Sequence, residues 1–277
     1  MGGNRGSQIA VEGLSFTYPG ADRQALSGVD IVFEQGQFCA ILGRNGSGKS
    51  TLARCLNALL LPSAGTVTSC GLDTQDPGNS LDIRKRLSMV FQDPNTQIVG
   101  TTVEEEVAFG PENLGHPCGA IRERVNSSLE LTGIRGLARS QPSRLSEGQK
   151  QLVAIAGALA MEPAFLISDE STSMLDNTAR QRILELFLSL KEQGIGIIHV
   201  THFLEEASMA DRVVVLDDGR VTAESAPPDI LFDPDKVREL GLDPLPVTLV
   251  AKEMSALGHP PAGPVLTVEE LISCIRA

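Results

Sequence analysis

The stretch Gly43-Arg44-Asn45-Gly46-Ser47-Gly48-Lys49-Ser50-Thr51 decides the fold of this chain. It has the pattern GxxxxGK followed by Ser or Thr, which is typical of a loop that binds phosphate groups. Its context fits, because the apolar run 38–42 precedes it and a helical pattern to about residue 60 follows it. Glycines let backbone N–H groups curl around phosphates, and the helix N-terminus adds a positive dipole. We predict a nucleotide site with Lys49 on the β- and γ-phosphates and Ser50 on Mg²⁺; a plain glycine turn is the alternative.

A second chemical signal is the apolar run Phe165-Leu166-Ile167-Ser168, which ends in the carboxylates Asp169 and Glu170. At the tip of a strand, Asp169 can hold the Mg²⁺ shell, and Glu170 can orient or deprotonate an attacking water. An acidic residue after a strand is also a common helix cap. The combination with the phosphate loop is what favours catalysis.

The third signal is Leu145-Ser146-Glu147-Gly148-Gln149, which opens a helical pattern to residue 160. Ser-x-x-Gln is a capping box and needs no ligand to explain it. A capped helix start that contains glycine is also an anion site, so it can present Ser146 and Gly148 to a phosphate. Both interpretations hold together.

The pattern of apolar residues predicts an α/β fold. Strand-like segments lie at residues 9–18, 29–33, 38–42, 87–91, 164–168, 195–200 and 212–216, and helical patterns lie at 147–160 and 178–193. Continuous apolar strands separated by helices indicate a parallel sheet that is covered on both faces. From about Ala226, prolines punctuate two short helical patterns, 247–257 and 268–275, which predicts a small appended helical region.

Composition narrows the class of protein. The chain has 277 residues, 42% of them hydrophobic, which suffices for one large domain or one large and one small. Its 23 basic against 35 acidic residues give a net charge of −12, which repels nucleic-acid backbones. The longest apolar run, 153–161, is too short to cross a bilayer. The five cysteines lack metal-ligand spacing and fit reduced, mostly buried thiols.

The phosphate loop, Gln92, the Leu-Ser-x-Gly-Gln segment, Asp169-Glu170, Asp176 and His202 together resemble, in order and spacing, the motifs of an ABC ATPase. The resemblance covers residues 9–226. It implies a cassette at 1–225, with a phosphate-loop core around a parallel sheet, an antiparallel β subdomain and a helical subdomain at about 92–160. Residues 226–277 form a C-terminal helical extension, for which the finer resemblance given below implies a role in dimerisation.

The same resemblance implies roles for further residues. Tyr18, the only tyrosine, matches the aromatic that stacks on adenine, although a strand-end aromatic packed in the core looks the same. Gln92 matches the glutamine that touches Mg²⁺ and relays the nucleotide state. His202 matches the switch histidine near the γ-phosphate; a zinc pair with His199 is disfavoured because no complementary ligands are visible. The implied catalytic set is Lys49, Gln92, Glu170 and His202.

In this family the catalytic site is shared between two subunits. The resemblance implies that Ser146, Gly148, Gln149 and Asp176 of one subunit close over ATP that the phosphate loop of the other holds. The implied cofactors are ATP and Mg²⁺, with Ser50, Gln92 and Asp169 around the metal ion.

A finer resemblance concerns residues 91–100 and 102–110, Phe-Gln-Asp-Pro-Asn-Thr-Gln-Ile-Val-Gly and Thr-Val-Glu-Glu-Glu-Val-Ala-Phe-Gly. These segments, together with 154–163, 172–176 and the tail, look like energy-coupling factor (ECF) transporter ATPases, which serve vitamin and cobalt or nickel uptake. The implied partners are a second ATPase subunit (the same or a different chain), a transmembrane scaffold protein and a membrane-embedded substrate-binding subunit, without nucleic acid. The implied location is the cytoplasmic face of the membrane, as a peripheral protein.

By the same resemblance, Glu104, Glu105 and Glu106 face a groove for the arginine-bearing coupling helices of the scaffold, where carboxylates suit an arginine fork. A solvated acidic helix face is the alternative. Three positions depart from the family pattern: Glu147 in place of glycine, Leu152 in place of arginine and Ser168 in place of an apolar residue. We expect Glu147 to point away from the nucleotide. A soluble ABC ATPase without a transport role, an exporter cassette and a non-hydrolysing regulatory subunit are the competing interpretations.

Overall fold

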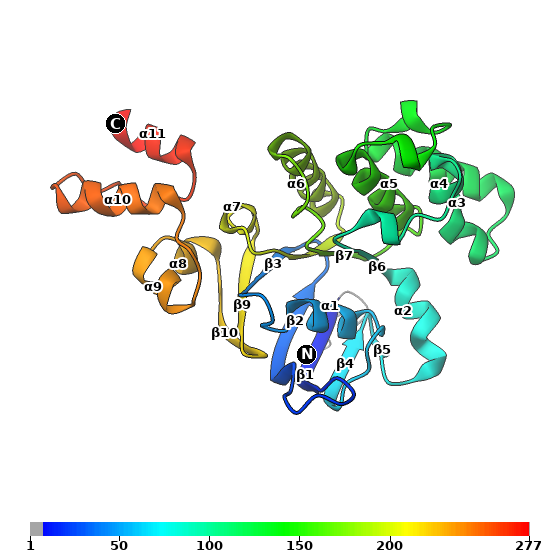
Figure 1. Cartoon of the computed structure of the whole chain (residues 1–277), viewed down its shortest axis with the longest axis horizontal. Helices are drawn as coiled ribbons and strands as arrows, with labels where there is room; N and C mark the ends of the chain where they lie inside the picture. The colour runs from blue at the N-terminus through cyan, green and yellow to red at the C-terminus, as the bar shows by residue number, and fades with distance from the viewer. Residues whose placement is uncertain (1–7, 277) are drawn as a thin grey trace.

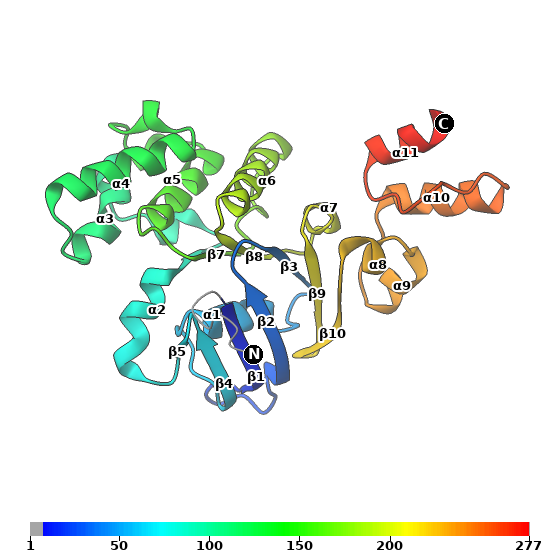
Figure 2. The same ribbon diagram turned by 180° about the vertical axis from the view of Figure 1, so that it is seen from behind.

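The computed structural model describes residues 8–276; residues 1–7 and 277, at the outer ends of the predicted cassette and extension, lie outside the described residues. Within residues 8–276 the chain forms a six-stranded and a four-stranded sheet. In Figure 1, one group of helices (green) lies at one end of the sheets and the C-terminal helices (orange and red) lie at the other, and Figure 2 shows the same arrangement from behind. The sheets therefore form the centre of an elongated molecule.

The six-stranded sheet has the order β10-β9-β3-β8-β7-β6. Its strands are β3 (Phe38–Leu42), β6 (Leu87–Val90), β7 (Phe165–Asp169), β8 (Gly196–Val200), β9 (Arg212–Asp217) and β10 (Arg220–Ser225). All pair in parallel except β10, which runs antiparallel to β9. Every residue of β3, β7 and β8 is buried, as expected for strands covered on both faces. The predicted parallel sheet is confirmed; β10 was missed because its exposed residues alternate with half-buried ones.

The four-stranded sheet is antiparallel and has the order β2-β1-β4-β5. Its strands are β1 (Gln8–Phe16), β2 (Leu26–Glu34), β4 (Ala64–Ser69) and β5 (Leu72–Asp73). A core that includes Phe33, Leu52, Leu56 and Phe165 fills the space between the two sheets and α1 (Lys49–Leu56). Strands β4 and β5 were not predicted, because β4 has a single buried apolar residue, Val67, which is flanked by threonines and glycine.

The helical subdomain lies between β6 and β7. It contains α3 (Val103–Asn113), α4 (Cys118–Leu131) and α5 (Glu147–Leu159), and α2 (Ser80–Arg86) precedes β6. Helix α3 begins with a capping box in which Thr102 and Glu105 bond each other's backbone. Helix α6 (Asn177–Glu192) and the short α7 (Leu204–Ala207) follow β7 and β8. Apolar residues of α3, α5 and α6 share one core with the parallel sheet.

The C-terminal extension consists of α8 (Pro227–Leu231), α9 (Pro234–Glu239), α10 (Pro246–Ala256) and α11 (Val268–Arg276). The first two helices were not predicted, because each has fewer than seven residues. Leu231 and Val237 belong to the same core as Val213 and Val215 of β9. The proposed boundary between residues 225 and 226 remains a prediction, and no break in the core marks it.

None of the helices in the described part of the chain combines the length and the apolar character that a membrane span requires.

The shared core predicts how the extension unfolds. Leu231 is fully buried, so Leu231→Ala is expected to cost about 2–5 kcal/mol of unfolding free energy, through lost transfer energy and a residual cavity. Leu257→Ala is the matched control, because Leu257 is 76% exposed, and it is expected to change stability by less than about 0.5 kcal/mol. Urea unfolding followed by circular dichroism measures both. A separate early transition for the extension, with the main transition unchanged by Leu231→Ala, would contradict a shared core.

Candidate functional site

The phosphate loop joins β3 to α1. The ammonium of Lys49 is folded back onto the loop and donates hydrogen bonds to the carbonyl oxygens of Gly43 at 2.8 Å and Arg44 at 3.1 Å. Gly48, at the start of α1, has φ +104°, and a Cβ there would lie 2.5 Å from the carbonyl oxygen of Ala25. Only glycine fits this position without a shift of the backbone. The loop is therefore built as the sequence pattern predicts.

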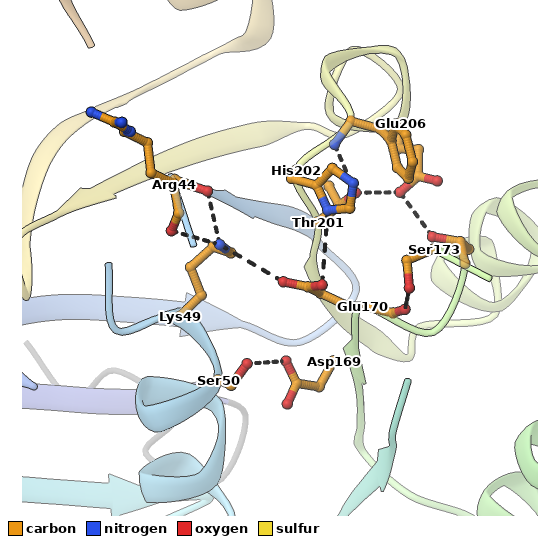
Figure 3. A network of polar contacts seen from close by, with 12 residues as sticks. Arg44, Lys49, Ser50, Asp169, Glu170, Ser173, Thr201, His202 and Glu206 are labelled. Atoms are coloured by element: carbon orange, nitrogen blue, oxygen red, sulfur yellow. Dashed lines mark hydrogen bonds and ion pairs between the residues drawn. The ribbon is translucent and has the colours of Figure 1, made fainter. Parts of the chain in front are cut away.

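Two carboxylates and a histidine face the loop across the edge of the sheet (Figure 3). The Ser50 hydroxyl donates to Asp169 Oδ1 at 2.7 Å. Glu170 lies between two nitrogen atoms, with Lys49 Nζ 3.8 Å from its Oε1 and His202 Nδ1 3.8 Å from its Oε2. Five predicted site residues from three separate segments thus lie together.

Burial shifts the pKa values of two residues in this group, Lys49 and Asp169. Burial lowers the pKa of Lys49, and the neighbouring Glu170 and Asp169 oppose that shift. Burial raises the pKa of Asp169 against the hydrogen bond from Ser50 and the charges of Arg54 and Lys49. The Ser50 hydroxyl and the Asp169 carboxylate are adjacent hard oxygen donors, and the carboxylate charge is incompletely compensated. This donor set fits Mg²⁺, which prefers oxygen ligands.

The backbone of Glu170 is strained. Its φ is +52°, a left-handed value that costs a residue other than glycine about 1–3 kcal/mol and persists only where its surroundings impose it. Here they do, because the Glu170 N–H donates to the Val200 carbonyl at 3.0 Å and its own carbonyl accepts from the backbone N–H and hydroxyl of Ser173. Strain of this kind gathers at functional sites.

The remaining residues predicted to bind nucleotide flank this group. The Tyr18 hydroxyl and Thr51 Oγ1 are 3.1 Å apart, and the 38%-exposed Tyr18 ring packs edge-to-face on Phe16. The tyrosine is therefore partly packed and partly available. Gln92 follows β6 and is exposed. Arg44 points away from Glu170 and packs on Gly241 of the extension, at the edge of a cleft of about 830 Å³. The sequence pattern had not indicated that the extension reaches the phosphate loop.

The segment with the family signature begins α5 and is capped as predicted. Ser146 Oγ accepts from the Gln149 N–H, and the Gln149 side chain accepts from the Ser146 N–H. A Cβ on Gly148 would lie 2.7 Å from the Cβ of Ala179, so glycine lets α5 approach α6. Asp176 caps α6 by accepting from the Ala179 N–H at 2.9 Å.

Glu147, the departure within this segment, is paired. Its carboxylate lies 2.7 Å from Lys150 Nζ and 3.1 Å from Asn95 Nδ2, and Lys150 also donates to Asn95 at 2.9 Å. The extra negative charge is neutralised by its own helix. Leu152, the second departure, is a core residue.

The signature residues do not join the phosphate-loop group. Within residues 8–276, no hydrogen bond or ion pair connects Ser146, Gly148, Gln149 or Asp176 to the loop or to Glu170. Sequence reasoning also missed Glu206, a buried carboxylate behind the site. The one available signal was Ser168, the polar residue in an otherwise apolar strand.

Comparisons with known proteins agree with this geometry. Residues 26–173 match the family model described as ABC transporter. The chain belongs to the ABC transporter family. It is 48% identical to the energy-coupling factor transporter ATP-binding protein EcfA1 of Symbiobacterium thermophilum, with 96% of each chain covered. It is 44% identical to the cobalt import ATP-binding protein CbiO of Syntrophus aciditrophicus, with 97% of this chain and 96% of the relative covered.

Solved structures are similar as well. CbiO1 of Clostridium perfringens, described as part of the ABC transporter complex cbiONQ, superposes with a TM-score of 0.77 at 34% identity, with 90% of this chain and 98% of that one covered. A dimeric ATP-binding cassette bound to ADP and Pi gives a TM-score of 0.72 at 30% identity, with 79% and 98% covered. The predicted ABC cassette fold and the assignment as an ATP-binding ATPase are confirmed. The roles of single residues remain predictions.

The raised pKa of Asp169 predicts a pH-dependent stability change. An acid whose folded pKa is raised costs folding free energy when ionised; the cost is full above its folded pKa and vanishes below the unfolded value, 3.8. Asp169→Asn keeps an oxygen for Ser50 and removes this charge. It is expected to raise the urea midpoint at pH 7.5, and the gain is expected to shrink toward pH 4. Asp22→Asn, at an exposed position, is the control, and a lower midpoint for Asp169→Asn at pH 7.5 would contradict the argument.

Proposed function

We propose that this chain is the ATP-hydrolysing subunit of an ECF-type importer, which couples ATP-driven dimer closure to the uptake of a vitamin or a transition-metal ion. The proposed hydrolysis depends on one observation: five side chains lie together at one edge of the sheet, those of Lys49, Ser50, Asp169, Glu170 and His202. Similarity over nearly the whole length to EcfA1 and CbiO proteins supports the importer class. The alternative is an ABC ATPase that acts outside transport.

Each residue of the site has a proposed task. The phosphate loop, residues 43–51, wraps the phosphates, and Lys49 leaves the loop carbonyls to contact the β- and γ-phosphates. Glu170 orients the attacking water and accepts its proton, and His202, on the far side of Glu170, contacts the γ-phosphate. Tyr18 stacks on adenine. Mg²⁺, when bound, neutralises charge between the phosphates; Ser50, Asp169 and Gln92 are its proposed protein neighbours.

The signature residues act on a second subunit in this proposal. Ser146, Gly148, Gln149 and Asp176 are separate from their own phosphate loop, and the capped start of α5 suits an anion. ATP therefore makes contacts in a closed dimer that an open dimer lacks, and this difference drives closure. Full conversion of such an equilibrium requires about 5.5 kcal/mol of preference between the two states. Two nucleotides clamped between two subunits can supply it.

The membrane partner is proposed to dock in a groove between the parallel sheet and α3. Leu59, Arg84, Glu106 and Phe109 contribute to its lining, and Leu59 and Phe109 are exposed apolar residues. Of the three predicted docking carboxylates, Glu106 alone lines the groove, and its Oε2 already accepts from two backbone N–H groups at 2.7 Å.

The other two carboxylates, Glu104 and Glu105, do not line the groove. Glu105 closes the capping box of α3, and Glu104 is exposed. We propose that an amphipathic scaffold helix buries Phe109 and reaches Glu106 with a basic side chain. The chain then lies at the cytoplasmic face of the membrane, with the scaffold, a second ATPase subunit and a membrane-embedded substrate-binding subunit as partners.

Replacing the proposed base tests the catalytic assignment. Glu170→Gln is expected to lower the ATP turnover number by at least about 100-fold, because an amide cannot accept the proton of water. ATP binding and ATP-dependent dimerisation are expected to persist, since Lys49 and the phosphate loop are untouched. Phosphate release and size-exclusion chromatography with ATP measure the two properties. Equal turnover in the variant and the wild type would show that Glu170 is not the base.

A substitution in the groove tests docking. Phe109→Asp places a charge at a half-exposed position, so the fold and ATP binding are expected to survive while the membrane-bound fraction falls at least tenfold in cells that co-express the neighbouring membrane proteins; about 1.4 kcal/mol corresponds to that factor. Leu131→Asp, at an exposed apolar position on α4, is the matched control and is expected to remain bound. Equal membrane-bound fractions for the two variants would exclude this groove as the docking site.

A further inference from the structure

A chain of buried side-chain hydrogen bonds lies behind the Glu170 turn. Ser171 Oγ and Ser168 Oγ are 2.6 Å apart, and Ser168 Oγ lies 2.9 Å from His199 Nδ1. His199 Nε2 lies 2.7 Å from Glu206 Oε2. None of these four residues is more than 1% exposed. Buried polar side chains in such a place are costly unless they find partners, and here each of the four bonds at least one other, although Glu206 Oε1 accepts no hydrogen bond.

The series of hydrogen bonds ends at Glu206, whose carboxylate has further partners. Its Oε2 also accepts from Thr201 Oγ1 at 2.5 Å and from Thr172 Oγ1 at 3.0 Å, and its Oε1 lies 3.4 Å from Arg180 Nε. Burial raises the pKa of Glu206, but the hydrogen bond and charge of His199 and the hydroxyl donors outweigh it and hold the pKa below its usual range. The carboxylate is therefore ionised at neutral pH and acts only as an acceptor.

An ionised acceptor sets the proton positions around it. His199 Nε2 must donate to Glu206, and His199 Nδ1 shares a hydrogen bond with the Ser168 hydroxyl. Ser168 Oγ in turn shares a hydrogen bond with the hydroxyl of Ser171. Every hydroxyl and both ring nitrogens then have a partner. The polar residue Ser168, which departs from the family pattern, is thus explained by its place in this hydrogen-bond network.

One end of the network holds the strained turn that carries Glu170. Ser168 and Ser171 bracket Asp169 and Glu170, and their mutual hydrogen bond closes the turn from behind. Glu170 has its left-handed φ of +52° inside this bracket. A change in the serine pair is therefore expected to alter the direction in which the Glu170 carboxylate points.

The other end holds the turn that carries His202. Thr201, bound to Glu206, directly precedes His202. Arg180 on α6 has its guanidinium carbon 3.9 Å above the centre of the Phe203 ring, and that ring packs on the His202 ring at 4.1 Å between centroids. Figure 3 shows Glu206 beside the turn that carries Thr201 and His202, on the side away from Lys49.

We propose that Glu206 is a positioning residue for ATP hydrolysis: through His199 and Ser168 it fixes the Glu170 turn, and through Thr201 and Arg180 it fixes the His202 turn. This rests on the proposed roles of Glu170 and His202. Glu206 touches neither substrate nor the reacting atoms in this scheme. A directional network sets angles that an apolar core of the same volume leaves free, and an error of about 1 Å in a reacting group can cost about 100-fold in rate.

Two variants of the full-length chain test the proposal, and both are assayed with Mg-ATP. Glu206→Gln keeps the volume but replaces an acceptor oxygen with an amide donor. Ser168→Ala removes one hydroxyl and is the milder change. Each is expected to lower kcat at least about tenfold with KM for ATP within about twofold, because the turns that position water are disturbed and the phosphate loop is not. Glu192→Gln, at the exposed C-terminal end of α6, is the control for the charge change.

The double variant separates a network from two unrelated defects. Residues of one network are not additive, so Ser168→Ala combined with Glu206→Gln is expected to match the slower single variant within about twofold. Wild-type kcat in Ser168→Ala would overturn the proposal, even if Glu206→Gln fails to fold. A lowered melting temperature with unchanged kcat would show a structural role only and would also overturn it. A wild-type chain without ATP hydrolysis would overturn the proposed function itself, and the network with it.

Discussion

The parallel pairing of β3, β7 and β8 is the constraint on which the rest of this structure depends. Ile41 of β3 and Asp169 of β7 both pair with Val200 of β8, so the three strands end at one level of the sheet. The phosphate loop, Glu170 and the Thr201-His202 turn follow these ends directly, and Asp169 is the last residue of β7. Parallel strands need long connections between them, and the helical subdomain and α6 occupy those connections. A site formed from residues more than 150 positions apart is thus fixed by a backbone hydrogen-bond register.

The site that results is not optimised for stability. Burial raises the pKa of Asp169, Lys49 is desolvated, and Glu170 has a left-handed backbone. Such features persist only when the surroundings impose them. Here the fully buried strands supply rigidity, and the Glu206 network sets the orientation of the turns that carry Glu170 and His202. The signature segment and the groove lie away from this rigid centre, where they are free to meet a second subunit and a membrane partner.

Much of this could be predicted from the sequence, where the signal is local. The glycines and Lys49 predict the phosphate loop. Four apolar or small residues in a row predict the strand that leads to Asp169. The fold class follows from the alternation of such strands with helices. Strand β4 could not be found, because its single buried apolar residue, Val67, gives no alternating pattern. The short helices α8 and α9 lack a full helical period.

The contacts that could not be predicted are those between distant segments. Arg44 packs on Gly241, although the two residues are far apart in the sequence, and no sequence pattern near either residue predicts this contact. The resemblance to ECF ATPases implied that Glu104, Glu105 and Glu106 form a docking face, but the sequence does not reveal that Glu105 is used as a cap and that Glu106 binds backbone N–H groups. Ser168 was recognised as unusual, and its partner His199 became visible only in three dimensions.

The central claim is that this ATPase drives a membrane transporter. The most direct test is to tag the chain, co-express its neighbouring genes, extract the membranes gently and identify the proteins that co-purify. The account predicts a transmembrane scaffold protein, a second ATPase subunit of the same or a different sequence, and a small membrane-embedded substrate-binding protein. Recovery of soluble partners alone, from an extract in which ATP hydrolysis by the chain is intact, would contradict it.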